Sequence, residues 1–140
     1  MSVRSKFSGR GRMAAALAVL SFLSPAAGAE TAQAFRRIVL FENEEVQVLD
    51  LQYPPGSVAP LHGHEYPHRV LYVEAGGTLE IVPGRKGADG ALELEPGAQG
   101  RVVNLTPGQT LWLPAQTHLL RNVGKTFVRV IEIEIKKSGR

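Results

Sequence analysis

The sequence predicts an all-β domain, an antiparallel sandwich or barrel, that follows an N-terminal leader. Between residues 36 and 135, short β-rich runs alternate with turns rich in glycine and proline. No segment after residue 30 keeps a helical hydrophobic period over three turns. About eight to ten such runs are typical of a sandwich or barrel, and closure into a barrel buries the edges of the sheets.

Each expected strand is a β-rich run that ends at a turn signal. In chain order we expect strands over residues 36–41, 45–53, 68–74, 78–82, 91–95, 101–105, 110–113, 118–123 and 126–135. Residues 83–90 (PGRKGADG) are polar and rich in glycine, which is typical of a solvent-exposed loop tip. The last run alternates with period two, and it places Val128 and Val130 on one face together with Glu132 and Glu134.

Residues 1–29 have the three parts of a secretory signal peptide. A basic segment precedes an apolar run over 13–23, Pro25 breaks that run, and Ala27-Gly28-Ala29 supplies the small residues of a cleavage site before Glu30. The apolar run is too short for a permanent membrane helix, which needs about 20 residues. We therefore expect a signal peptide over 1–29, a mature domain over 30–140, and a periplasmic or secreted protein without a permanent membrane anchor.

The charge and cysteine content exclude several classes of function. The chain has 16 basic and 13 acidic residues, and four of the basic ones lie in the leader. Residues 30–140 thus carry a net charge near −1, which removes the electrostatic argument for nucleic-acid binding. The absence of cysteine excludes disulfides, cysteine-ligated metals and a cysteine nucleophile. The four histidines remain as nitrogen ligands for a transition metal.

Those four histidines fall in two windows of the chain. His62 and His64 are two residues apart, so in a strand they project from the same face and their imidazoles can converge on one ion. His118 follows the turn at Pro114, and His68 is the fourth.

Both windows resemble motifs of the cupin superfamily. Gly56, His62, His64 and Gly76 match the first motif, a glycine, His-x-His, an acidic position and a terminal glycine. The second motif is matched by Gly108, Pro114, His118 and Asn122, with Gln116 in place of an internal glycine and one residue fewer before the histidine.

The resemblance covers residues 46–135 and extends to small exported bacterial cupin-domain proteins. It implies a single small cupin-type β-barrel, jelly-roll-like and double-stranded. In metal-binding cupins a glutamate of the first motif completes a site of three histidines and one carboxylate. Arg69 occupies that position here, and a guanidinium cannot coordinate a cation.

Three interpretations of the histidine windows remain open. In the first, His62, His64 and His118 bind a divalent transition metal (Fe, Mn, Ni, Cu or Zn), and a register slip of one residue would add His68 as a fourth ligand. In the second, no metal binds, and Arg69 and the histidines hold a small anionic ligand. In the third, the barrel is a non-catalytic dimerisation or interaction module.

The expected partners are a small organic molecule and a second copy of the chain, in a homodimer that pairs an outer sheet face. Catalysis stays open, with a metal-dependent dioxygenase- or isomerase-like reaction as the class implied by the resemblance. Asn122 is expected to brace a turn through side-chain hydrogen bonds to the backbone. The candidate ligand-binding residues are Arg69, Tyr66, Trp112 and Gln116.

Overall fold

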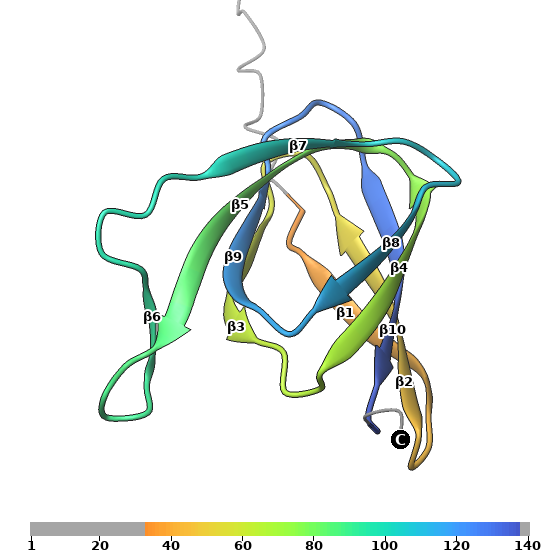
Figure 1. Cartoon of the computed structure of the whole chain (residues 1–140). Coiled ribbons are helices and arrows are strands. Elements are labelled where there is room, and N and C mark those ends of the chain that lie inside the picture. Colours follow the sequence, from red (N-terminus) through yellow and green to blue (C-terminus); the bar gives the residue numbers. More distant parts are fainter. Residues whose placement is uncertain (1–32, 138–140) are drawn as a thin grey trace, which may run out of the picture.

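The structure is a computed structural model that describes residues 33–137, and all of its regular elements are β-strands (Figure 1). The predicted signal peptide lies outside the described residues. Over 33–137, no helix of the length and apolarity needed to cross a membrane is present. In chain order the strands are β1 (Arg36–Glu42), β2 (Val46–Tyr53), β3 (Val58–Gly63), β4 (His68–Ala75), β5 (Gly77–Lys86), β6 (Leu92–Leu94), β7 (Arg101–Leu105), β8 (Thr110–Pro114), β9 (Thr117–Asn122) and β10 (Val128–Ile135).

The strands form two antiparallel sheets that curl toward each other into a half-barrel (Figure 1). One sheet has the order β1-β2-β10-β4-β8, and the other has the order β3-β9-β5-β6, with β7 also paired to β5. The predicted all-β class and the jelly-roll-like barrel are therefore confirmed. The first sheet carries Glu132 and Glu134, whereas His62 and His118 lie in the second.

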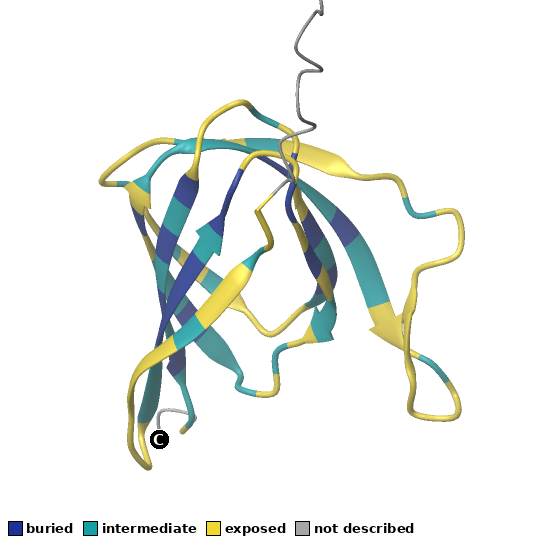
Figure 2. Ribbon diagram, turned by 180° about the vertical axis from the view of Figure 1, so that it is seen from behind, coloured by how far each residue is buried: buried dark blue, intermediate teal, exposed yellow. Residues whose placement is uncertain are grey.

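The core lies between the sheets because alternate residues of their inner strands are apolar. Leu49, Leu51 and Tyr53 of β2 are buried, and residues at every second position of β10 are buried as well (Figure 2). The predicted alternation of the last strand is thus confirmed. The second sheet contributes Ala59, Leu79 and Leu120 to the same core.

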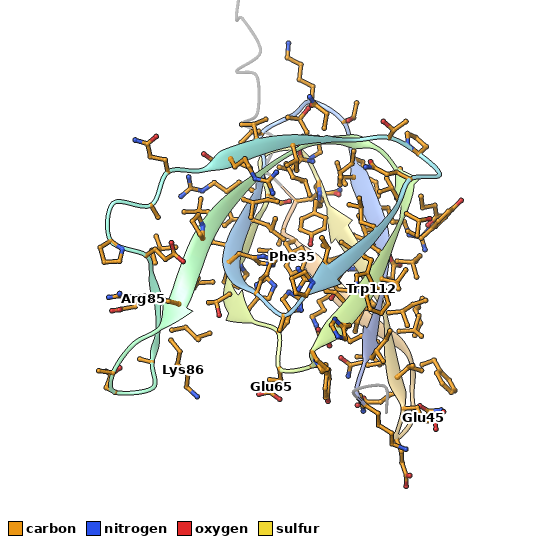
Figure 3. All side chains as sticks on the ribbon, in the orientation of Figure 1. Phe35, Glu45, Glu65, Arg85, Lys86 and Trp112 are labelled. Carbon is orange, nitrogen blue, oxygen red and sulfur yellow. The ribbon has the colours of Figure 1, made fainter. Side chains whose placement is uncertain are left out.

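Two strands differ from the expected ones. β3 was not among them, because Pro60 and the flanking glycines weaken its strand signal; β3 is an edge strand, where a proline costs no ladder hydrogen bond. β5 runs on to Lys86 through the expected loop and pairs with β6, with Arg85 opposite Glu93 and in an ion pair with it. Figure 3 shows Arg85 and Lys86 far from the barrel, on this projecting hairpin.

Asn122 holds together the chain segments at the end of β9. Its side-chain amide nitrogen donates to the backbone oxygens of Tyr53 and Thr126 at 2.7 and 2.8 Å, and its side-chain oxygen accepts from the backbone of Gly124 at 3.0 Å. The bracing role predicted for Asn122 is confirmed. Gly56 and Gly108 adopt φ of 76° and 83°, a region that favours glycine, so these two motif positions serve turns.

Candidate metal centre

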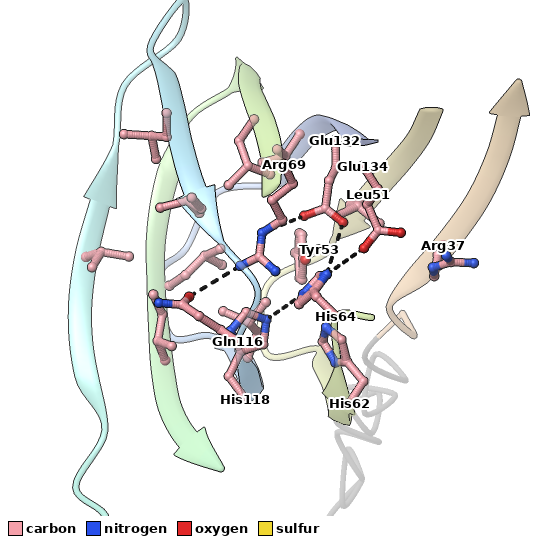
Figure 4. A pocket seen from close by; sticks show the side chains of 18 of the residues that line it. Arg37, Leu51, Tyr53, His62, His64, Arg69, Gln116, His118, Glu132 and Glu134 are labelled. Carbon is pink, nitrogen blue, oxygen red and sulfur yellow. Dashed lines mark hydrogen bonds and ion pairs between the residues drawn. The ribbon is translucent and has the colours of Figure 1, made fainter. Parts of the chain in front are cut away.

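The pairing of β3 with β9 brings the two histidine windows together. His62 and His118 are direct cross-strand partners in this ladder. His64 follows the last residue of β3, and its backbone nitrogen donates to the backbone oxygen of Gln116 at 3.0 Å. This hydrogen bond fixes His64 beside the start of β9, so that all three imidazoles face the same point between the sheets (Figure 4).

The three imidazoles form a nearly equilateral triangle. The ring centroids of His62, His64 and His118 lie 4.8 to 5.1 Å apart, and each pair of rings meets edge to face at 68° to 82°. One ring nitrogen of each histidine lies within 4.8 Å of the other two, and the Nε2 atoms of His64 and His118 are 3.2 Å apart. The structure thus brings together the three histidines that the sequence predicts as ligands.

Hydrogen bonds orient two of these rings. Nδ1 of His62 lies 2.7 Å from the backbone oxygen of Pro60, and Nδ1 of His64 lies 2.6 Å from Oε1 of Glu134. A carbonyl oxygen and a carboxylate only accept hydrogen bonds, so in both rings the hydrogen is on Nδ1. The lone pair of each neutral ring is then on Nε2.

Burial favours the neutral form of His64 and His118. Desolvation, followed by the nearby His62 and Arg69, lowers the pKa of His118 to about 3. Burial also lowers the pKa of His64, although the hydrogen bond to Glu134 acts in the opposite direction. Neutral imidazole is the form that binds a metal ion, so the site offers its ligands without first losing a proton.

Arg69 points into the site and does not turn away from it. Its side chain is 3% exposed, and its Nε lies 3.4 Å from Oε2 of Glu132 in an ion pair (Figure 4). Its Nη2 donates to Oε1 of Gln116 at 3.3 Å, whereas Nη1 has no hydrogen-bond partner among the described residues. Arg69 therefore brings a permanent positive charge next to the histidines.

Glu132 and Glu134 are site residues that the sequence analysis did not select. Both are buried, and with His64 they form a second group of possible ligand atoms within 4.8 Å of one another. Burial raises the pKa of Glu132 to about 7 although Arg69 opposes this, and the hydrogen bond from His64 lowers the pKa of Glu134. The signal was the alternation of β10, which puts both glutamates on the same face as the core valines.

Two of the other candidates lie outside the site. His68 and Trp112 stack on each other with ring centroids 5.0 Å apart, and Trp112 is 61% exposed. Because neighbouring residues of a strand face opposite sides, the inward position of Arg69 turns His68 outward. The expectations of a fourth histidine ligand and of a ligand-binding Trp112 are thus not met by the geometry.

The three histidines line a cavity of about 900 Å³ between the two sheets. Tyr66 and Gln116, which the sequence predicts as ligand-binding residues, are part of its wall, as are Arg69 and both glutamates. Leucine and valine side chains of β4, β7 and β8 form an apolar part of this wall. A volume of this size is typical of pockets for small organic molecules.

Solved structures of similar architecture show to which fold this arrangement of strands belongs. A cupin domain from Bordetella pertussis Tohama I aligns with a TM-score of 0.58 and 24% identity over 76% of this chain and 97% of its own. A double-stranded β-helix protein from Klebsiella pneumoniae aligns with a TM-score of 0.52 and 20% identity over 91% and 95%. The polyketide cyclase RemF from Streptomyces resistomycificus aligns with a TM-score of 0.52 and 18% identity over 76% and 68%.

No protein-family sequence model matches the chain, and no curated protein sequence does. The likeness is therefore one of fold. The chain has the double-stranded β-helix fold of the cupin superfamily, and its site is a cluster of histidines suited to a metal.

Proposed function

We propose that the protein binds one divalent transition metal through His62, His64 and His118 and that its cavity receives a small organic molecule beside that metal. The observation that carries this proposal is the triangle of imidazoles that meet edge to face. A histidine cluster that only served packing would not need two rings with their Nδ1 hydrogens already donated and their lone pairs left on Nε2.

The distances fit a metal ion. Two metal–nitrogen bonds of about 2.1 Å that meet at roughly 100° place their nitrogens about 3.2 Å apart, which is the separation of Nε2 in His64 and Nε2 in His118. Nδ1 of His118 is buried without a hydrogen-bond partner among the described residues. In the metal-free protein the lone pair on Nε2 of His64 accepts the Nε2 hydrogen of His118 at 3.2 Å, so coordination by His118 would require that hydrogen to move to its Nδ1.

The donor set is three nitrogens, because Arg69 stands where the cupin resemblance places a carboxylate ligand. Glu134 acts through His64: it accepts the Nδ1 hydrogen and so keeps the other nitrogen basic. A metal held by three imidazoles would supply Lewis acidity at coordination positions open to a small molecule. The protein supplies the buried cavity around those positions.

Metal analysis of protein purified without chelator or histidine tag tests this proposal. We expect about one equivalent of a divalent transition metal in the wild type after reconstitution, and less than a tenth of that in His62→Ala and His118→Ala. His68→Ala is the matched control, since His68 lies on the opposite face, and it should bind as the wild type does. Wild-type protein that takes up no metal, or equal loss in His68→Ala, would contradict the proposal.

We also propose that the chain is exported, on the pattern of residues 1–29. N-terminal sequencing of the protein recovered outside the cytoplasm should begin at Glu30. A first residue of Met1 would contradict this.

A further inference from the structure

Arg69 has hydrogen-bond donors that no residue of the described chain uses. The guanidinium is 3% exposed, and Nη1 has no partner, while the contact of Nη2 with Gln116 is long at 3.3 Å. Glu132 lies 3.4 Å from Nε, which has no hydrogen-bond partner among the described residues either. A buried donor without an acceptor costs free energy, so this arrangement is suited to an acceptor that comes from outside the protein. Figure 4 shows the guanidinium between Glu132 and Gln116, on the cavity wall.

Formal charges leave room for one anion once a metal is bound. Arg69 contributes one positive charge, and the two buried glutamates beside it, Glu132 and Glu134, contribute two negative ones. A divalent metal at the three histidines would bring this sum from −1 to +1, and a monoanion beside it would restore neutrality.

The wall changes from charged to apolar along the strands. Arg69, Leu71 and Val73 follow each other on the inner face of β4. Across the ladders, Arg69 is opposite Leu113 on β8 and Glu134 on β10, and Val73 is opposite Val130. One end of the cavity therefore carries Arg69 and the glutamates, and the apolar wall begins two residues further along the same strand.

We propose that this cavity binds an organic monocarboxylic acid with an apolar body. The carboxylate accepts hydrogen bonds from Arg69 next to the histidine cluster, and the apolar body lies against Leu71, Val73 and Leu111. A planar guanidinium matches the two oxygens of a carboxylate, and a single buried guanidinium suits a single negative charge. The inference deepens the proposed function. It rests on that function only in that it places the acid beside a bound metal.

Calorimetric titration with matched probes tests the inference. The acids are octanoate and naphthoate, and their neutral counterparts are octanol and naphthylmethanol. For the wild type we expect each acid to bind at least about tenfold more tightly than its alcohol. Glu132→Gln, which leaves Arg69 in place, should keep this preference. Arg69→Met combined with Glu132→Gln removes the buried pair together and should reduce the preference to less than about twofold.

Three results would overturn the inference: equal affinity for acid and alcohol, no binding of either acid to the wild type, or an acid preference that survives in the double variant. Should the double variant fail to fold, the wild-type and Glu132→Gln titrations still decide the question. The same preparations are assayed for metal content before titration, with and without chelator. If the protein binds metal normally but does not prefer the acids, this inference alone is wrong. If the protein prefers the acids but takes up no metal, only the proposed metal site is wrong.

Discussion

The imidazole of His64 and the carboxylate of Glu134 are joined by a 2.6 Å hydrogen bond between residues 70 positions apart in the chain. The bond links the two sheets at the site, since Glu134 lies on β10 and His64 follows β3. It also sets the orientation of a ring whose other nitrogen is 3.2 Å from His118. Glu134 is thus the residue outside the histidine triangle that most directly controls it.

Removal of Glu134 should weaken metal binding. We expect Glu134→Ala to lower metal affinity by about 10- to 100-fold, because the ring loses the acceptor that orients it and raises its basicity. Glu134→Gln keeps an acceptor without the charge and should lose less. Competitive titration against a chromogenic chelator measures both, with Glu74→Gln, a half-exposed glutamate of β4, as the control. An unchanged metal affinity in Glu134→Ala would show that Glu134 does not have this role.

The stability of the metal-free protein should depend on the protonation of His118. Its pKa is about 3 in the folded state and 6.5 in the reference state. As the pH falls below 6.5, the unfolded chain binds a proton that the folded chain does not, so this residue makes stability fall between pH 6.5 and 3. The slope is at most about 1.4 kcal/mol per pH unit.

Glu132 acts in the opposite direction over part of this range. Its pKa rises from 4.5 to about 7 on folding, so the folded state binds the extra proton and stability falls as pH rises from 4.5 to 7. Comparison of wild type with His118→Gln, by urea unfolding in chelator from pH 4 to 8, isolates His118. We expect the wild type to lose stability relative to the variant as the pH is lowered. Parallel pH profiles would show that His118 does not carry this effect.

The ion pair of Arg69 and Glu132 predicts a strong non-additivity in stability. Both side chains are buried, so Arg69→Met leaves a carboxylate in the interior without its partner and should cost about 3–5 kcal/mol. The double variant Arg69→Met/Glu132→Gln should recover most of that loss, because no unpaired charge remains. Denaturant unfolding of the two single variants and the double variant measures the coupling. Additive losses would mean that the two residues act independently.

Asn122 should contribute to the stability of the fold and not to metal binding. Asn122→Ala leaves the buried backbone oxygen of Tyr53 without its donor, and we expect a loss of about 1–3 kcal/mol with metal affinity unchanged. Asn104→Ala is the control: Asn104 is exposed and accepts a single hydrogen bond from Thr78, so its loss should stay below about 0.5 kcal/mol. Urea unfolding and metal titration together separate the two outcomes.

The local hydrophobic pattern of the sequence predicts a strand well where that strand has one buried face. β10 alternates clearly, and the expected ranges of β2 and β10 agree with the observed ones to within a few residues. It was poor at edges: β3 contains Pro60, and the end of β5 over residues 83–86 is polar and partly exposed, so neither has an apolar period to detect. These elements exist because their neighbours supply backbone partners, which no local pattern records.

Sequence alone determined the all-β class, the two histidine windows and the absence of any thiol chemistry, because these depend on residue types and on periods of a few residues. Only the tertiary structure decided that Arg69 faces inward, that His68 and Trp112 face outward, and that two glutamates from the last strand adjoin the histidines. The physical reason is strand register: a shift of one residue exchanges the two faces of a strand, and register is set by pairing between segments far apart in the chain.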